Sequence, residues 1–181
     1  MAINHEIIIA GFGGQGILSA GRIIAQAAMI EGKNVSWLPS YGPEMRGGTA
    51  NCHVIVSEDP IGSPILNSAN SLIVMNSPSL DKFEEIVIPD GNIIIDSSLI
   101  SKCPNRIDVH IYKIPATKIA SDMGNQTYAN VVLLGKLIAI TNAVSKQSII
   151  ESLRIILPEK KHYMIPDEIK ALEIGIAYNN E

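Results

Sequence analysis

The sequence predicts an α/β fold, a three-layer, Rossmann-like sandwich around a mixed, mostly parallel sheet, with residues 1–181 forming a single domain. Short β-branched apolar runs alternate with helical segments, which is typical of sheets buried on both faces. A glycine-rich turn joins the first apolar run to the first helix. A chain of 181 residues is long enough for one domain with a sizeable core.

The first forty residues predict a strand–helix–strand unit. The apolar run 6–10 ends at a glycine and predicts a strand buried on both faces. A helix is expected over 15–31, because apolar residues form one stripe and Gly32 stands at the position of a C-terminal cap. Residues 35–38 predict the second strand, and prolines and glycines place 39–48 in a loop.

The middle of the chain predicts a change of strand direction. A strand is expected over 49–57, followed by turn residues and a short apolar run at 61–66. This arrangement resembles an antiparallel excursion more than a helical crossover, and it is the reason to expect a mixed sheet. Further strands are expected at 71–76, 91–96 and 109–114, with a short helix at 79–85.

The last third of the chain predicts helices. The segment 125–141 is apolar nearly all round, which indicates a buried helix. Ser145 and Ser148 compete as N-caps of a helix that ends before Pro158, and Pro166 starts a last helix that extends to about residue 174.

The composition argues against some classes of partner. The net charge of −4 and the pI near 5.6 give no electrostatic reason to expect nucleic acid. No signal peptide and no membrane-spanning run of about 18 to 20 apolar residues is recognisable, so a cytoplasmic protein is expected. Charged residues are 18% of the chain, against roughly 25% in ordinary soluble domains. Either a partner covers apolar surface, with self-association when the chain is isolated, or an isoleucine-rich core explains the composition.

Metal and nucleophile chemistry find little support. Cys52 and Cys103 are expected to be buried structural thiols, because an iron–sulfur cluster needs about four cysteine ligands. The four histidines are scattered, and His53 fits an ordinary strand position better than a catalytic base. The segment 96–98, at a strand end, is expected to cap a helix or turn. No catalytic residue and no metal site is predicted.

The glycine-rich turn is the first candidate site and comprises Gly11, Gly13, Gly14, Gln15 and Gly16. Glycines after a strand let the backbone approach a ligand, and the following helix offers unpaired N–H groups that suit a phosphate or carboxylate. The acidic ribose ligand of a dinucleotide site is missing after the second strand, which disfavours NAD or FAD. Another phosphate-bearing ligand and packing against a neighbouring subunit both stay open.

A second loop contributes further candidate residues. They are Tyr41, Gly42, Glu44, Arg46, Gly47 and Gly48. In a doubly wound fold this loop emerges at the same carboxyl edge as the first, so the two loops should border one crevice. Arg46 offers a fork of donors for an anion, while the alternative is that it pairs with Glu44 or across an interface.

These two loops together carry a family resemblance. Gly-Gly-Gln-Gly at 13–16 and Ser-Tyr-Gly-Pro-Glu-Met-Arg-Gly-Gly at 40–48 resemble the gamma subunit of 2-oxoacid:ferredoxin oxidoreductases, the pyruvate/ketoisovalerate oxidoreductase gamma family. The similarity continues through 124–126, 130–135, 144–145 and 171–175 and so extends over the whole chain. In appearance the 2-oxoglutarate enzymes are nearest, with pyruvate and branched-chain enzymes as neighbours.

The resemblance implies a subunit that is not active alone. The complex would decarboxylate a 2-oxoacid oxidatively to the acyl-CoA and pass electrons to ferredoxin or a similar acceptor. Thiamine diphosphate, Mg²⁺ and iron–sulfur clusters would be held by alpha, beta and possibly delta subunits. This chain would bind no cofactor by itself and would contribute to the coenzyme A region. Gln126 stands near a position where relatives often have an arginine, which weakens a coenzyme A role for that helix start.

Overall fold

The computed structural model describes residues 4–40 and 49–179 as one mixed sheet with helices on both faces. The strands are β1 (His5–Phe12), β2 (Asn34–Ser40), β3 (Thr49–Ser57), β4 (Ala69–Val74), β5 (Val87–Asp96) and β6 (His110–Ile114). The α-helices are α1 (Ile17–Ile30), α2 (Ser77–Phe83), α3 (Ala116–Asp122), α4 (Ala129–Thr141), α5 (Lys146–Ile156) and α6 (Ile165–Ala177). The described residues also contain three short 3₁₀ helices: η2 (Glu84–Ile86), η3 (Gln126–Tyr128) and η4 (Glu159–Met164).

The sheet has the strand order β2-β3-β1-β4-β5-β6. β3 runs antiparallel to both β1 and β2, whereas β4, β5 and β6 continue parallel to β1. The predicted mixed, mostly parallel sheet is therefore confirmed. The carboxyl ends of β1, β2, β4, β5 and β6 all meet at one edge, which we call the carboxyl edge.

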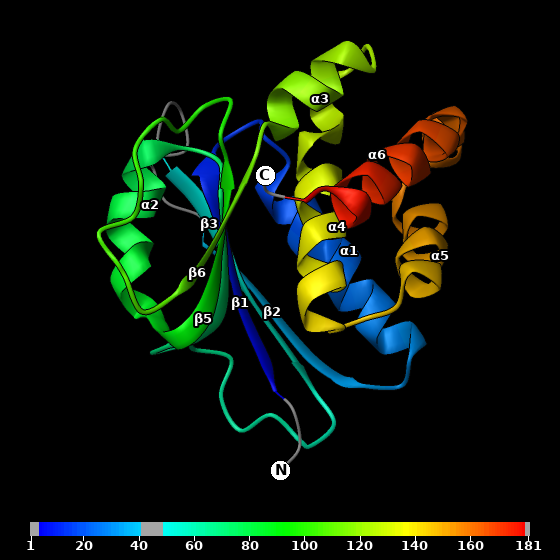
Figure 1. Ribbon diagram of the computed structural model, residues 1–181. Coiled ribbons are helices and arrows are strands. Elements are labelled where there is room, and N and C mark those ends of the chain that lie inside the picture. Colours follow the sequence, from blue (N-terminus) through cyan, green and yellow to red (C-terminus); the bar gives the residue numbers. More distant parts are fainter. Residues whose placement is uncertain (1–3, 41–48, 180–181) are drawn as a thin grey trace.

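Figure 1 shows α2 on one side of the sheet and α1, α4, α5 and α6 on the other. The central strand β1 is buried on both faces, because Ile7 and Ile9 pack toward α1 and α4 while Ile8 and Ala10 pack toward α2. This alternation explains the continuous apolar run that predicted the strand. None of the helices within 4–40 and 49–179 combines the length and apolar character needed to cross a bilayer.

Some details of the sheet differ from the predictions or go beyond them. β3 lies between β1 and β2, so the first two predicted strands are parallel without being neighbours. β2 extends through Pro39, which is tolerated because β2 is an edge strand. The apolar run 61–66 forms no strand; Leu66 is instead buried in the core beneath α2.

Two helices begin at capping side chains that residue spacing in the sequence did not single out. Ser145 caps α5, because its hydroxyl accepts the N–H of Ser148 at 3.1 Å; the alternative cap at Ser148 is wrong. α3 was not predicted at all. Its start is fixed by buried Asp96, whose carboxylate accepts the Thr117 hydroxyl at 2.6 Å, which bears out the predicted capping role of the 96–98 segment.

α4 and α6 cross at two glycines. A Cβ on Gly135 would lie 3.0 Å from the Cα of Gly175 and would also meet the Leu172 carbonyl of α6. A Cβ on Gly175 would meet the Val132 carbonyl of α4. The neighbouring Lys136 is buried over the Tyr112 ring and donates to the Tyr178 carbonyl at 2.9 Å, which also ties α4 to the end of α6.

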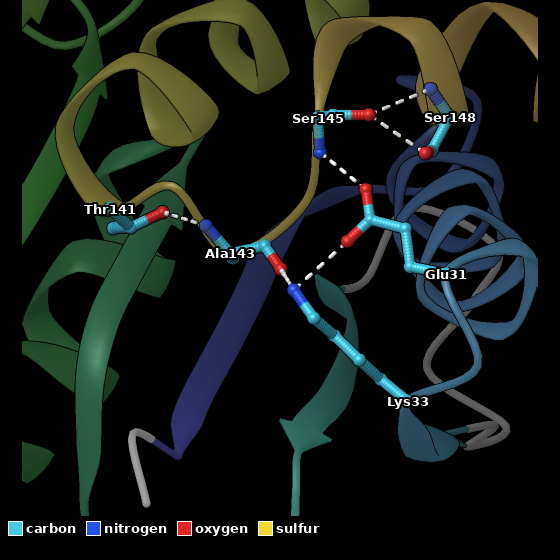
Figure 2. A network of polar contacts seen from close by, with 6 residues as sticks. All are labelled: Glu31, Lys33, Thr141, Ala143, Ser145 and Ser148. Carbon is cyan, nitrogen blue, oxygen red and sulfur yellow. Dashed lines mark hydrogen bonds and ion pairs between the residues drawn. The ribbon is translucent and has the colours of Figure 1, made fainter.

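Figure 2 shows a polar network that ties the end of α1 to the start of α5. The Glu31 carboxylate accepts the Ser145 N–H at 2.6 Å and pairs with Lys33 at 2.9 Å. Lys33 also donates to the Ala143 carbonyl at 2.9 Å. Partial burial raises the pKa of Glu31, but hydrogen bonds from Ser145, Lys33 and Ser148 outweigh it and lower the pKa to about 2.

Glu31→Gln is therefore expected to make the free energy of unfolding fall less steeply as the pH is lowered. A carboxylate with a depressed pKa stabilises the fold above its ordinary value near 4.5, and that contribution disappears as the pH falls toward 2. After solvent screening, about 1 kcal/mol should be lost at neutral pH and almost nothing at pH 2. Urea denaturation of both proteins at pH 7 and pH 3 measures the difference; an equal deficit at both pH values would contradict the role of the charge.

Candidate functional site

The glycine loop follows β1 at the carboxyl edge and is closed by its own glutamine. Gln15 accepts the Phe12 N–H through Oε1 at 2.6 Å and donates through Nε2 to the Met75 carbonyl at 3.1 Å. It therefore joins the ends of β1 and β4. A Cβ on Gly11 would lie 2.6 Å from Gln15 Oε1, so this glycine makes room for the glutamine.

The loop passes into α1 through Gly16, whose φ of 76° lies in the left-handed region. Asn130 of α4 donates through Nδ2 to the Gly16 carbonyl at 3.0 Å, and a Cβ on Gly16 would lie 2.5 Å from that nitrogen. The Oδ1 of Asn130 is buried without a hydrogen-bond partner in the described part of the chain. α1 begins without a side-chain cap, so its first N–H groups have no partner from a capping residue.

Three hollows meet at Gly14. One of about 290 Å³ lies against Gln15, Met75 and Leu99, and one of about 320 Å³ lies over Phe12, Leu18 and Ala50. The largest of these three, about 590 Å³, extends away from the sheet between α1, α4, α5, η4 and α6, and we call it the helical groove. The first half of the predicted site is thus assembled around a fixed loop with space on several sides.

The second predicted loop lies outside the described residues, and with it Tyr41, Gly42, Glu44, Arg46, Gly47 and Gly48. The strand ends that flank it are placed. Thr49 pairs with Phe12 and Asn51 pairs with Ser40, so the chain leaves and re-enters the sheet at the carboxyl edge.

Apolar side chains are exposed along the same edge. Phe12, at the end of β1, and Leu99, shortly after β5, are 41% and 46% exposed. Large exposed apolar residues that gather around a loop are typical of a surface that contacts another molecule.

The helical groove contains a buried carboxyl group that sequence reasoning missed. Glu168 of α6 is 7% exposed and lines the groove with Arg22 and Lys161. Burial raises the pKa of Glu168 to about 7, although Lys161 partly opposes the shift. No motif marks these positions, because they are brought together from α1, η4 and α6.

Glu168→Gln is expected to stabilise the protein above neutral pH. The folded state keeps the Glu168 proton up to about pH 7. The contribution of this proton to the free energy of unfolding is therefore fully present below pH 4.5 and is lost as the pH rises through 7. Glutamine avoids that loss and should add about 1 to 2 kcal/mol at pH 8. The control is Asp167→Asn, at an exposed acid of the same helical turn. Urea denaturation at pH 5 and pH 8 measures both; a Gln variant no more stable at pH 8 than the wild type would refute the assignment.

The remaining candidates have structural positions. His53 lies on β3, as predicted, and burial lowers its pKa. The expectation that its ring would be satisfied by hydrogen bonds is not met, because Nδ1 is buried without a partner among the described residues. Cys52 is buried as predicted, and burial raises its pKa to about 12. Cys103 is exposed, so the prediction of a buried thiol is wrong there; it lies in the polar loop between β5 and β6, where Lys113 donates to its sulfur at 2.8 Å.

The donor set does not fit a metal cluster on this chain. The sequence has two cysteines, one inside the α1 face of the sheet and one on the surface, against the roughly four that an iron–sulfur cluster requires. Across residues 4–40 and 49–179, no three His, Cys, Asp or Glu side chains gather in a way that could hold a metal ion.

Comparison with known sequences agrees with the family resemblance that the two loop sequences predicted. A family model described as pyruvate ferredoxin/flavodoxin oxidoreductase matches residues 6–178. The 2-oxoglutarate synthase subunit KorC of Methanocaldococcus jannaschii is 39% identical over 150 residues, which cover 81% of this chain and 80% of that protein. The ketoisovalerate oxidoreductase subunit VorA of Methanothermobacter thermautotrophicus is 38% identical over 97% of this chain. The chain spans only 36% of the length of that relative.

Solved structures share the fold. The gamma subunit of a keto/oxoacid ferredoxin oxidoreductase from Geobacter sulfurreducens superposes with a TM-score of 0.82 at 30% identity, covering 95% of this chain and 96% of that one. A 2-oxoglutarate:ferredoxin oxidoreductase from Magnetococcus marinus has the same fold, with a TM-score of 0.87 at 24% identity, over 96% of this chain and 30% of that chain. The glycine loop, the sheet order and these matches lead to one conclusion. The chain belongs to the pyruvate ferredoxin/flavodoxin oxidoreductase family and is of its gamma-subunit type.

Proposed function

We propose that this chain is the gamma subunit of a 2-oxoglutarate:ferredoxin (acceptor) oxidoreductase, a complex that oxidatively decarboxylates the 2-oxoacid to its acyl-CoA. The chain forms a single domain in the cytoplasm and is inactive alone. Alpha, beta and possibly delta subunits hold thiamine diphosphate, Mg²⁺ and the iron–sulfur clusters. Coenzyme A binds at the contact between those subunits and this chain.

The exposed carboxyl edge is the observation that supports this role best. Phe12 and Leu99 leave apolar surface around a glycine loop that Gln15 holds in place. A loop that leads into a helix whose first N–H groups have no side-chain cap suits an anionic ligand shared with a neighbour. The cysteine content fits a subunit that leaves redox chemistry to other chains.

A branched-chain or pyruvate enzyme is the second candidate. The VorA relative is 38% identical, almost as similar as the KorC relative at 39%, and a pyruvate synthase subunit PorC of Methanothermobacter marburgensis is 27% identical. The groups that choose the oxoacid would lie in partner chains.

Purification of the native complex from its own cell tests the assembly. We expect this chain to co-purify with larger thiamine-dependent subunits and with brown iron–sulfur absorbance. Activity should favour 2-oxoglutarate over pyruvate and 2-oxoisovalerate. A native protein that is monomeric after gentle extraction, with no such chains, would refute the proposal, while a preference for another oxoacid would support the second candidate.

Arg46→Ala tests the proposed coenzyme A contact within that complex. If Gly11, Gly13, Gly14, Gln15 and Gly16 share a crevice with the 41–48 loop, removal of the guanidinium should raise KM for coenzyme A by about tenfold or more. The KM for the oxoacid should change much less. Lys170→Ala, at an exposed lysine of α6, is the control. Unchanged constants in a fully assembled Arg46 variant would show that this arginine has no role in binding.

A further inference from the structure

The helical groove has the size and lining of a small-molecule site. Its volume of about 590 Å³ lies within the range of roughly 300 to 1,000 Å³ that is usual for ligand pockets. Much of the lining is apolar and comes from four helices. These residues are Ile23, Val131, Leu153, Ile156, Leu157 and Met164.

Two cations line this groove and form no ion pair within the described residues. Arg22 of α1 and Lys161 of η4 both line it, and neither forms an ion pair or a side-chain hydrogen bond with any residue in the ranges 4–40 and 49–179. Other cations of the chain are used: Lys33 pairs with Glu31, and Arg106 pairs with Asp108. The pair in the groove is therefore available to an anion from outside.

Glu168 is the carboxyl group that lines the groove, and burial keeps it protonated up to about pH 7. The charged and titratable groups around it are Lys161 and Tyr163 of η4, Tyr128 of η3, Arg22 across the groove on α1, and Asp167 on its own helix. α5 contributes apolar lining. Below neutral pH, two positive charges thus face the groove beside an uncharged acid.

The start of α1 closes one end of the groove. Gly14, Gly16 and Ser19 line it there, and α1 has no side-chain cap. The first-turn N–H groups and the positive end of the helix dipole favour an anion at this end. The Oδ1 of Asn130, which has no partner in the described part of the chain, lies beside it and can accept a hydrogen bond only from a ligand hydroxyl, such as the P–OH of a monoanionic phosphate ester.

We propose that the helical groove binds a small organic phosphate, with the anion held by Arg22, Lys161 and the first turn of α1 and the apolar part against the groove lining. The groove lies wholly within this chain, so the inference does not depend on the assembly proposed above.

Calorimetric titration of the full chain with 1-naphthyl phosphate tests the site. Saturable binding is expected at pH 6.5, and Arg22→Ala and Lys161→Ala should each weaken it by about three- to tenfold. Arg154→Ala is the control, because this arginine is exposed on α5 and does not line the groove. No binding at millimolar ligand, or an equal loss in the Arg154 variant, would overturn the proposal.

A second titration uses 1-naphthalenesulfonate, whose charge is constant between pH 6 and pH 8. The wild type should bind it more tightly at pH 6 than at pH 8, because an ionised Glu168 repels the anion and competes for Lys161. Glu168→Gln should remove most of this dependence while still binding at pH 8. A dependence that persists unchanged in the Gln variant would exclude Glu168 from the site.

Discussion

Gly175→Ala is expected to destabilise the fold by at least about 3 kcal/mol, enough to unfold much of the protein at moderate temperature. The added Cβ would meet the Val132 carbonyl of α4, which belongs to the helical backbone and cannot move aside. α4 is the most buried helix of the structure, so its displacement would also disturb the core against the sheet. Thermal and urea denaturation followed by circular dichroism measure the loss.

Gly62→Ala is the matched control for this experiment. A Cβ at Gly62 would meet no atom within 4 Å, and its backbone does not occupy the left-handed region. Its stability should remain within about 0.5 kcal/mol of the wild type. If Gly175→Ala were equally well tolerated, the close crossing of α4 and α6 would be wrong.

Gly16→Ala is expected to cost about 2 to 3 kcal/mol and to loosen the glycine loop. Alanine at a φ of 76° costs about 1 to 2 kcal/mol in strain. Its Cβ would also displace Asn130 and weaken the hydrogen bond to the Gly16 carbonyl, which adds about 1 kcal/mol. Urea denaturation gives the total, and hydrogen exchange of the loop amides shows where the order is lost.

Gly14→Ala separates backbone strain from contact. Gly14 has a φ of 94°, and a Cβ there would meet no atom within 4 Å. Only strain remains, so the cost should be about 1 to 2 kcal/mol, smaller than at Gly16. Equal losses at both glycines would mean that Asn130 does not hold the loop.

The sequence was sufficient for the fold class because apolar periodicity reports burial directly. The run 6–10 is central in the sheet, and the nearly all-apolar 125–141 segment contains the buried helix α4. The insertion of β3 between β1 and β2 was not predictable, because strand order depends on pairing across the sheet and leaves no local pattern. α3 is short, and the contact from Asp96 that fixes its start is twenty-one residues distant in the chain.

The candidate site was predictable only in part. Spacing identified Gly11–Gly16 as a loop between a strand and a helix and counted Gln15 among the binding candidates, but it gave no sign of the structural role of this side chain. The structure shows that this side chain fills the loop interior and bonds to the end of β4. Arg22, Lys161 and Glu168 come from three separate elements, so their common groove is a property of the packed helices and not of any motif.

The position of β3 also has a consequence for folding during synthesis. Residues 5–40 contain two parallel strands that are not neighbours, and the strand that must pair with both begins at Thr49. The other partner of β1 begins at Ala69. A nascent polypeptide therefore exposes the edges of its most apolar strand until about residue 74 has emerged. Contacts between strands far apart in the sequence form slowly. The exposed strand edges therefore favour chaperone binding, and release of the nascent chain from a chaperone at this stage would favour aggregation.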